Sequence, residues 1–360
     1  MCFLFLHCAA AISLRRNNYI FKMKDLARFY AEPAQTAPVP APSGAALAVR
    51  HLQISSEEAG QRIDNFLLRI CKGVPKSHVY RVLRSGQVRV NKSRIDPTYR
   101  LQEDDVVRVP PLRVAEAPVR FVPGAEFRVL LEDGHLLVID KPAGVAVHGG
   151  SGVSFGVIEQ LRAARPQARF LELVHRLDRD TSGILLLARK RSALTHLHAQ
   201  MRDGQVDKRY LALVHGDWKN PTQHVRLPLF KYTTADGERR VRVQEDGQPA
   251  HTIFRRVGRY GDFTLLEAEL KTGRTHQIRV HLAASGFAIV GDEKYGDFSL
   301  NRALHKGQPG RPAFKRMFLH AHRITFAHPD SAQPVTLNAP LPPECADFLN
   351  SLRQAAAPHP

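Results

Sequence analysis

The chain has little cysteine: among its 360 residues there are four, Cys2, Cys8, Cys71 and Cys345. None belongs to a Cys-x-x-Cys pair, so a disulfide framework is not indicated and a reducing compartment is expected. No cluster of cysteines and histidines has the spacing of zinc ligands. The two close histidine pairs lie in apolar surroundings and are interpreted as structural or RNA-facing. These pairs are His196/His198 and His320/His322. We therefore expect no bound metal.

Long hydrophobic runs are missing as well. The apolar stretch at residues 3–12, FLFLHCAAAI, is too short to span a bilayer. Arg15 and Arg16 follow it, whereas the positive charges of a secretory signal precede the apolar run. We therefore expect no membrane contact, a cytoplasmic location, and a translation start at Met23, which opens an ordinary cytosolic segment.

Positive charge, by contrast, is present in excess. The sequence holds 52 Lys and Arg against 34 Asp and Glu, which gives a formal net charge of +18. Such a surplus attracts polyanions, and phosphate contacts supply most of the non-specific affinity for nucleic acids. RNA or DNA is therefore the expected partner. The alternative is a soluble protein that is basic without binding nucleic acid.

The N-terminal part divides into an extension and a compact unit. Residues 1–50 contain the stretch EPAQTAPVPAPSGAA, which has no large apolar anchor and is expected to be a flexible extension and linker. Residues 51–112 begin with apolar residues at helical spacing, namely Ile63, Phe66, Leu67 and Ile70. A second helix is expected to be capped by Ser77 and to end at Gly86. The later segments QVRVN and DVVRVP are predicted strands.

Basic residues occupy the outward positions of this compact unit. The candidates for RNA binding are Lys76, Arg81, Arg84, Lys92 and Arg94. A charge run can be only a solvated face, but clustering on a small helix-helix-hairpin unit favours RNA binding. The segments RIDNFL, VPKSHVYRVLRSGQVRVN and EDDVVRVP resemble an S4 domain, an RNA-binding module. The resemblance implies that the helices of this unit bind RNA.

The remaining sequence predicts a larger α+β domain. Residues 113–126 hold several prolines and are expected to be a linker, and residues 355–360 a tail. Between them, at 127–354, the segments LLVIDK, GILLLARK, RYLALVHG and FTLLEAEL are predicted strands, and VSFGVIEQLRAARP and ALTHLHAQMRDG are predicted helices. Strands and helices do not alternate regularly, so a mixed, mainly antiparallel sheet with flanking helices is expected instead of a doubly wound parallel sheet.

The densest group of polar residues precedes the predicted buried strand GILLLA. It runs from His175 to Ser182 and includes Asp178 and Asp180. Three interpretations are open on physical grounds. The two aspartates could be the carboxylate pair of a glycosidase. DTSG could belong to an aspartic protease, although that family requires Asp-Thr-Gly or Asp-Ser-Gly. The loop could also be an ion-paired structural turn.

A family resemblance separates these interpretations. HRLDRDTSG resembles the His-Arg-Leu-Asp-x-x-Thr-Ser-Gly signature of the RluA-type pseudouridine synthases, whose catalytic aspartate falls on Asp178. VIDKPAGVAVH resembles the first motif of the family. KRYLALVHG carries Tyr210, which matches its active-site tyrosine, and TGRTHQIRVHL carries Arg279, which matches the basic partner of the aspartate. Without the resemblance, Tyr210 would be interpreted as a core residue and the last motif as an exposed, basic strand edge.

The resemblance implies a chemistry for these residues. EAGQRIDNFL, GVPKSHVYR and VHGGSGVSFGVIE are most similar to the C-type ribosomal enzymes of the family, which implies isomerisation of uridines in large-subunit (23S) ribosomal RNA. The reaction needs no cofactor. Asp178 could attack C1′, attack C6 or remove a sugar proton, and an ionised carboxylate in a water-poor pocket explains the need for Arg279. Tyr210 would stack on the uracil of a flipped nucleotide.

Three further basic residues of the loop, His175, Arg176 and Arg179, are candidates for holding the displaced RNA backbone. The alternatives are a non-catalytic RNA-binding or ribosome-assembly protein and the same chemistry on transfer RNA. A binding protein would not need Asp178, Tyr210 and Arg279 together. We expect the chain to act as a monomer.

Overall fold

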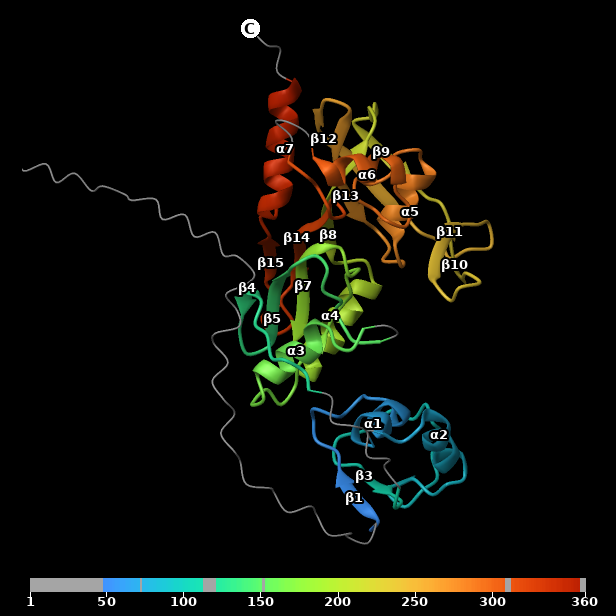
Figure 1. Cartoon of the computed structure of the whole chain (residues 1–360). Coiled ribbons are helices and arrows are strands. Elements are labelled where there is room, and N and C mark those ends of the chain that lie inside the picture. Colours follow the sequence, from blue (N-terminus) through green and yellow to red (C-terminus); the bar gives the residue numbers. More distant parts are fainter. Residues whose placement is uncertain (1–47, 72, 113–120, 151–152, 308–311, 357–360) are drawn as a thin grey trace, which may run out of the picture. The chain divides into compact units, whose positions relative to one another are not determined.

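A computed structural model of the chain describes residues 48–71, 73–112, 121–150, 153–307 and 312–356 (Figure 1). The predicted extension up to residue 47, the linker residues 113–120 and residues 357–360 lie outside this description. No helix of the described residues is both long and apolar enough to cross a membrane.

The unit at residues 50–109 consists of two helices and a small sheet. Its helices are α1 (Ile63–Ile70) and α2 (Lys76–Arg84), and its antiparallel sheet has the order β1 (Arg50–Gln53), β3 (Val106–Val109), β2 (Arg89–Val90). The predicted helical spacing is confirmed, because Ile63, Phe66 and Leu67 are buried in one cluster with the apolar residues of α2.

One local prediction for this unit is wrong. Ser77 does not cap α2: the helix begins at Lys76, its cap position is Pro75, and no side chain caps it. Proline suits this place because its fixed φ is compatible with a helix start and it has no N–H to leave unpaired. The predicted end is confirmed at Gly86, whose φ of 72° follows directly after the last turn of the helix.

The larger unit is built on a sheet that has ten strands in the described part of the chain. Its order is β4-β5-β7-β14-β8-β13-β12-β9, with β15 beside β14 and β6 beside β7. β7 and β14 are parallel and the other pairs are antiparallel, so the predicted mixed, mainly antiparallel α+β fold is confirmed. The strands are β4 (Arg128–Glu132), β5 (Leu136–Lys141), β6 (Glu172–Leu173), β7 (Ser182–Ala188), β8 (Asp207–His215), β9 (Thr222–Val225), β12 (Thr252–Tyr260), β13 (Phe263–Leu270), β14 (Leu319–Ala327) and β15 (Pro334–Asn338).

Helices cover both faces of this sheet, which explains why β7 is buried along its whole length. Successive strand residues point to opposite faces. Leu185 and Leu187 pack in the cluster that includes α3 (Val157–Ala164) and α5 (Gln277–Ala284). Ile184 and Leu186 pack in the cluster that includes α4 (Arg191–Arg202). Two further helices, α6 (Phe298–Lys306) and α7 (Pro343–Ala356), contribute to a third cluster.

A two-stranded hairpin, β10 (Leu229–Thr233) and β11 (Arg239–Val243), stands apart from the large sheet and lies beside α5 (Figure 1). The segment that begins α5 could be interpreted from its sequence as an exposed strand edge, and this interpretation is wrong. Gln277 to Leu282 are six consecutive buried residues in a helix. A helix buried on all sides carries no apolar stripe, so its sequence lacks the usual period.

Candidate active site

The polar loop between β6 and β7 holds the expected catalytic residues, and its exit is fixed by a glycine. Gly183 has a φ of 108°, and a Cβ atom there would collide with the carbonyl oxygen of Ala321 on the neighbouring parallel strand β14. Only glycine allows this close approach. The last position of the HRLDRDTSG segment therefore fixes the loop at the start of β7, beside β14.

The first motif, VIDKPAGVAVH, is hydrogen-bonded to the backbone of the same loop. Lys141 at the end of β5 is fully buried, and its ammonium group donates to the carbonyl oxygens of Pro142 and Val145 at 2.8 Å each and of Arg179 at 3.0 Å. The N–H of Gly144 donates to the Arg179 oxygen as well, at 2.9 Å. Burial lowers the pKa of Lys141 to about 7, whereas one carbonyl acceptor for each ammonium proton favours the charged form. The backbone beside Asp178 is thus held in place.

Arg279 connects two aspartates. Its Nη1 donates to Asp178 Oδ2 at 2.9 Å, and its Nε and Nη2 donate to the two carboxylate oxygens of Asp292 at 2.7 and 2.8 Å. Asp292 Oδ1 also accepts the backbone N–H groups of Lys294 and Tyr295. The fork of Arg279 is therefore oriented by Asp292, and the Asp178 carboxylate keeps one oxygen that no Arg279 nitrogen holds.

The charges of this group stabilise one another. Burial would lower the pKa of Arg279, but its hydrogen bonds to Asp292 and the nearby Asp178 raise the pKa above its usual value. Burial would also raise the pKa of Asp292, and the Arg279 guanidinium holds that pKa low. The side chain of Asp178 is 27% exposed against 6% for Arg279 and 1% for Asp292. Asp178 is thus the member of the group that a substrate can reach.

Tyr210 lies on β8 and lines the same cavity as Asp178 and Arg279, which has a volume of about 1220 Å³. Tyr210 is 7% exposed, and burial together with the Asp178 charge raises the pKa of its hydroxyl. The hydroxyl is therefore neutral at physiological pH. The structure thus brings together all three residues that the sequence indicated as catalytic.

The basic residues of the loop divide into two kinds. Arg176 and Arg179 are exposed at the cavity, and Arg179 pairs with Asp180 at 3.1 Å. His175 also lines the cavity, but its Nε2 accepts the backbone N–H of Leu186 at 3.2 Å, and burial lowers its pKa to about 4. An uncharged, hydrogen-bonded ring is not a phosphate-binding cation, so the predicted role of His175 is not supported.

Several site residues were missed by reasoning from the sequence. Six further residues line the cavity with positive charge: Arg202, Lys208, Arg274, Lys294, Lys315 and Arg316. Lys208 and Arg274 lie within two of the family motifs, KRYLALVHG and TGRTHQIRVHL. Their place in these motifs could have identified them as site residues. Asp292 and Tyr295 lie in no motif that was singled out, so only the fold reveals their contact with Arg279.

The predicted RNA-binding residues of the small unit all have exposed side chains. They are Lys76, Arg81 and Arg84 on α2 and Lys92 and Arg94 after β2. Arg94 donates to the carbonyl oxygen of Arg84 at 2.6 Å, so its side chain lies against the end of α2. Exposure and clustering are what phosphate contacts require.

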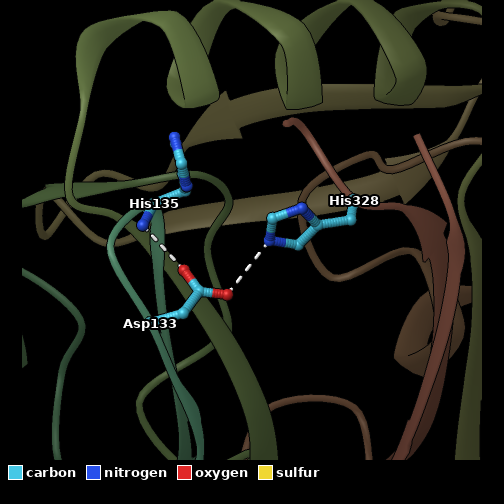
Figure 2. Close-up of side chains that lie close together, drawn as sticks. All are labelled: Asp133, His135 and His328. Atoms are coloured by element: carbon cyan, nitrogen blue, oxygen red, sulfur yellow. Dashed lines mark hydrogen bonds and ion pairs between the residues drawn. The ribbon is translucent and has the colours of Figure 1, made fainter. Parts of the chain in front are cut away.

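One group of three potential metal ligands occurs in the described residues, away from the motifs: Asp133, His135 and His328. Asp133 accepts the backbone N–H of His135 at 2.7 Å and Nε2–H of His328 at 3.0 Å (Figure 2). His328 Nδ1 accepts two backbone N–H groups of the following turn, and His135 Nε2 accepts the Lys190 ammonium at 2.9 Å. Both oxygens of Asp133, both ring nitrogens of His328 and Nε2 of His135 thus have hydrogen-bond partners within the protein. We interpret the group as a brace between the β4–β5 turn and the end of β14.

The arrangement around Asp178 is suited to chemistry at a sugar–base bond. A carboxylate with one oxygen anchored by arginine has a second oxygen available as a nucleophile or base. The buried tyrosine ring offers a surface for a planar base, and the surrounding cations offer contacts for phosphates.

Comparison with known proteins agrees with this geometry. A family model described as RNA pseudouridylate synthase matches residues 135–284, and a model of the S4 domain matches residues 61–107. The ribosomal large subunit pseudouridine synthase C of Pasteurella multocida is 54% identical over 314 residues, 85% of this chain and 95% of that protein. The protein of the same name from Escherichia coli is 50% identical over 314 residues, 85% of this chain and 98% of that protein.

A solved structure supports the same family at the level of the fold. Human RNA pseudouridylate synthase domain containing 4 is 26% identical to the chain, covers 63% of it and 93% of its own length, and superposes with a TM-score of 0.52. The predicted resemblance is confirmed. The chain belongs to the RNA pseudouridylate synthase family, among the ribosomal large subunit pseudouridine synthase C proteins, and it carries an S4 domain.

Proposed function

We propose that the chain isomerises specific uridines of large-subunit (23S) ribosomal RNA to pseudouridine, with Asp178 as the catalytic carboxylate. The observation that carries the proposal is the geometry of Asp178, whose Oδ2 accepts Arg279 Nη1 at 2.9 Å and whose side chain faces a large cavity. The relatives of 50–54% identity, whose name refers to the ribosomal large subunit, support this choice of RNA.

The chemistry follows from the residues around the cavity. The reaction breaks the N1–C1′ bond of uridine, turns the detached uracil and bonds its C5 to C1′, so the atoms balance without a co-reactant. Asp178 acts through the oxygen that Arg279 does not hold. Tyr210 stacks on the uracil, and its neutral hydroxyl lies near C5, from which a proton leaves. No step requires an oxidant or a reductant, and we expect no cofactor.

RNA is held in two places in this proposal. Arg176 and Arg179 at the cavity bind phosphates next to the flipped nucleotide, and the exposed cations of the S4 domain bind another part of the RNA. We propose further that the protein acts as a monomer in the cytoplasm. Two cysteines of the described chain, Cys71 and Cys345, are buried free thiols, which suits a reducing compartment.

The test is pseudouridine mapping of ribosomal RNA from cells that lack the protein. The cells are complemented with the wild type, with Asp178→Asn, or with Asp347→Asn as a matched control. Asp347 is exposed on α7 and does not line the cavity. We expect defined large-subunit sites to disappear and to return with the wild type and Asp347→Asn only.

Other outcomes separate the parts of the proposal. Unchanged ribosomal sites would exclude this substrate, and transfer RNA would be mapped next. Full restoration by Asp178→Asn would exclude Asp178 as the catalytic group and would favour a protein that only binds RNA.

A further inference from the structure

His276 stands at the catalytic carboxylate, although neither the sequence motifs nor the proposed reaction assigns it a role. It lines the cavity, and its Nε2 lies 3.9 Å from Asp178 Oδ1, the oxygen that Arg279 leaves available. On the other side of the ring, Nδ1 lies 2.8 Å from the hydroxyl of Tyr295. The imidazole is therefore held at Nδ1 by the Tyr295 hydroxyl, and its Nε2 lies near the reacting carboxylate without a hydrogen bond to it.

The hydrogen bonds of Tyr295 determine where the His276 proton lies. The Tyr295 oxygen accepts the backbone N–H of Val241 on β11 at 2.9 Å, which leaves its own proton available for the contact with His276 Nδ1. Burial raises the pKa of the Tyr295 hydroxyl, so it keeps that proton. An imidazole that accepts at Nδ1 carries its hydrogen on Nε2 when neutral. The Nε2–H group thus points toward Asp178.

The surroundings of the His276 ring favour its uncharged form. Burial lowers the pKa of His276, and although Asp178 raises the pKa, the cations Arg279 and Lys294 lower it again. A neutral N–H is a donor that does not pair permanently with the carboxylate. At 3.9 Å the group makes no hydrogen bond to Asp178, so the donor is available to an atom that enters beside Oδ1.

The backbone at His276 is strained, which is a second indication of a functional role. His276 has a φ of 53° and a ψ of 20°, the left-handed region, directly before α5. Such a conformation costs a non-glycine residue free energy and is found preferentially at functional sites. The residue in this conformation lines the cavity.

We propose that His276 is a further catalytic residue, whose Nε2–H donates a hydrogen bond to a carbonyl oxygen of the uracil while the base is detached from the sugar. The inference rests on the proposed function. When the N1–C1′ bond breaks, the electron pair leaves with the uracil, and the negative charge spreads over N1 and both carbonyl oxygens. A fixed donor stabilises this charge, and it transfers no proton.

The symmetry of uracil makes a single donor sufficient. The rotation that exchanges N1 with C5 runs about the axis through N3 and C6, and it also exchanges O2 with O4. A donor beside the sugar-linked edge therefore holds O2 before the rotation and O4 after it. His276 Nε2–H accordingly serves both the bond that breaks and the bond that forms.

The test combines a change in the enzyme with a change in one substrate atom. Single-turnover rates are measured on a large-subunit RNA fragment with uridine or 2-thiouridine at the position that the wild type modifies. Sulfur is a poor acceptor, so we expect the wild type to react about 10-fold slower or more on the thio substrate. His276→Leu removes the N–H and is expected to lose about 10- to 100-fold on uridine, with little additional loss on 2-thiouridine.

Two variants test the assignment further. His276→Gln keeps an N–H near the position of Nε2 and is expected to retain more of the rate than His276→Leu. His281→Gln is the matched control: His281 lies on α5, the helix that His276 directly precedes, is bonded to Thr252 and to the carbonyl of Leu227, and does not line the cavity. This variant is expected to show the same ratio of the uridine rate to the 2-thiouridine rate as the wild type, which we call the thio effect, even if it is less stable.

The outcomes separate this inference from the function on which it rests. If the wild type does not convert the RNA, the proposed function fails. If the wild type converts it and His276→Leu shows the same thio effect as the wild type, the function stands and the role of His276 is excluded. A merely structural role of His276 would lower both rates of the variant in proportion, which also counts against the proposal.

Discussion

The ammonium group of Lys141 donates a hydrogen bond of 3.0 Å to the carbonyl oxygen of Arg179, the residue that follows Asp178. The two residues belong to separate sequence motifs, and the contact explains why the first motif accompanies the catalytic loop. Lys141 does not reach the cavity. It fixes the backbone from which the Asp178 side chain extends, together with the Gly144 N–H that bonds to the same oxygen.

Lys141→Met is therefore expected to lower the rate without weakening RNA binding. The variant removes the donor of the Pro142 and Val145 oxygens and leaves the Arg179 oxygen with the Gly144 N–H alone, so a loss of about 1–3 kcal/mol in the free energy of unfolding is expected. The single-turnover rate should fall about 10- to 100-fold because the carboxylate is no longer held in place. Urea unfolding and single-turnover assays at saturating RNA measure the two effects. Lys306→Met, an exposed change on α6, is the control, and an unchanged rate in Lys141→Met would contradict the positioning role.

The pair of Arg279 and Asp292 supports a second prediction. Arg279→Met leaves the Asp292 carboxylate buried without its partner, and about 3–5 kcal/mol of stability should disappear. The double variant Arg279→Met/Asp292→Leu removes both charges and should recover a large part of this stability. Activity should stay low in both, because Asp178 no longer has its anchor.

Thermal and urea unfolding of the wild type, both single variants and the double variant form a complete cycle. A double variant no more stable than Arg279→Met would show that the arginine stabilises the fold in another way. Recovery of activity in the double variant would show that Asp178 does not depend on Arg279.

The sequence was sufficient for much of the fold and for the centre of the site. Helical spacing predicted α1, Gly86 predicted the end of α2, and the apolar run after the polar loop predicted β7. The trio of Asp178, Tyr210 and Arg279 came from family motifs. Spacing alone left Asp178 open to three interpretations, because residues that meet in space carry no common period along the chain.

What could not be predicted depends on long-range contacts. Asp292 and Tyr295 follow α5 in an irregular segment without a periodic pattern, and only the folded chain brings them to Arg279 and His276. The lowered pKa of His175 likewise depends on burial of the ring, which only the folded chain provides. Burial of α5 on all sides removed the amphipathic signal by which a helix is recognised.

A buried histidine predicts how stability depends on pH. His320 is fully buried, with Nδ1 at 2.9 Å from the Ser182 hydroxyl and Nε2 at 3.3 Å from the Ala339 oxygen, and burial lowers its pKa to about 4. Above pH 6.5 the ring is neutral in both the folded and the unfolded chain. Below pH 6.5 the unfolded chain takes up a proton that the folded chain does not, so stability falls until pH approaches 4. This one group should cost about 2 kcal/mol between pH 7 and pH 5.

The comparison with His320→Gln isolates this contribution from other titrating groups. The variant should be less stable at pH 7, because the packing around the ring is disturbed, yet its stability should fall less steeply toward pH 5. Urea unfolding at several pH values measures the slopes. Parallel curves for the wild type and the variant would mean that His320 is not the group that titrates.

The exposed cations of the S4 domain support the last prediction. Lys76, Arg81 and Arg84 lie on α2, and removing one phosphate contact should reduce the slope of log Kd against log salt by about 0.7–0.9. The triple change to glutamine should therefore reduce the slope by about 2–3 and leave the single-turnover rate at saturating RNA unchanged. The control variant removes three exposed charges that do not line the cavity, Lys219, Arg302 and Lys306, and should leave the slope as it is. Equal slopes for the two triple variants would mean that net charge, and not the S4 surface, determines the affinity for RNA.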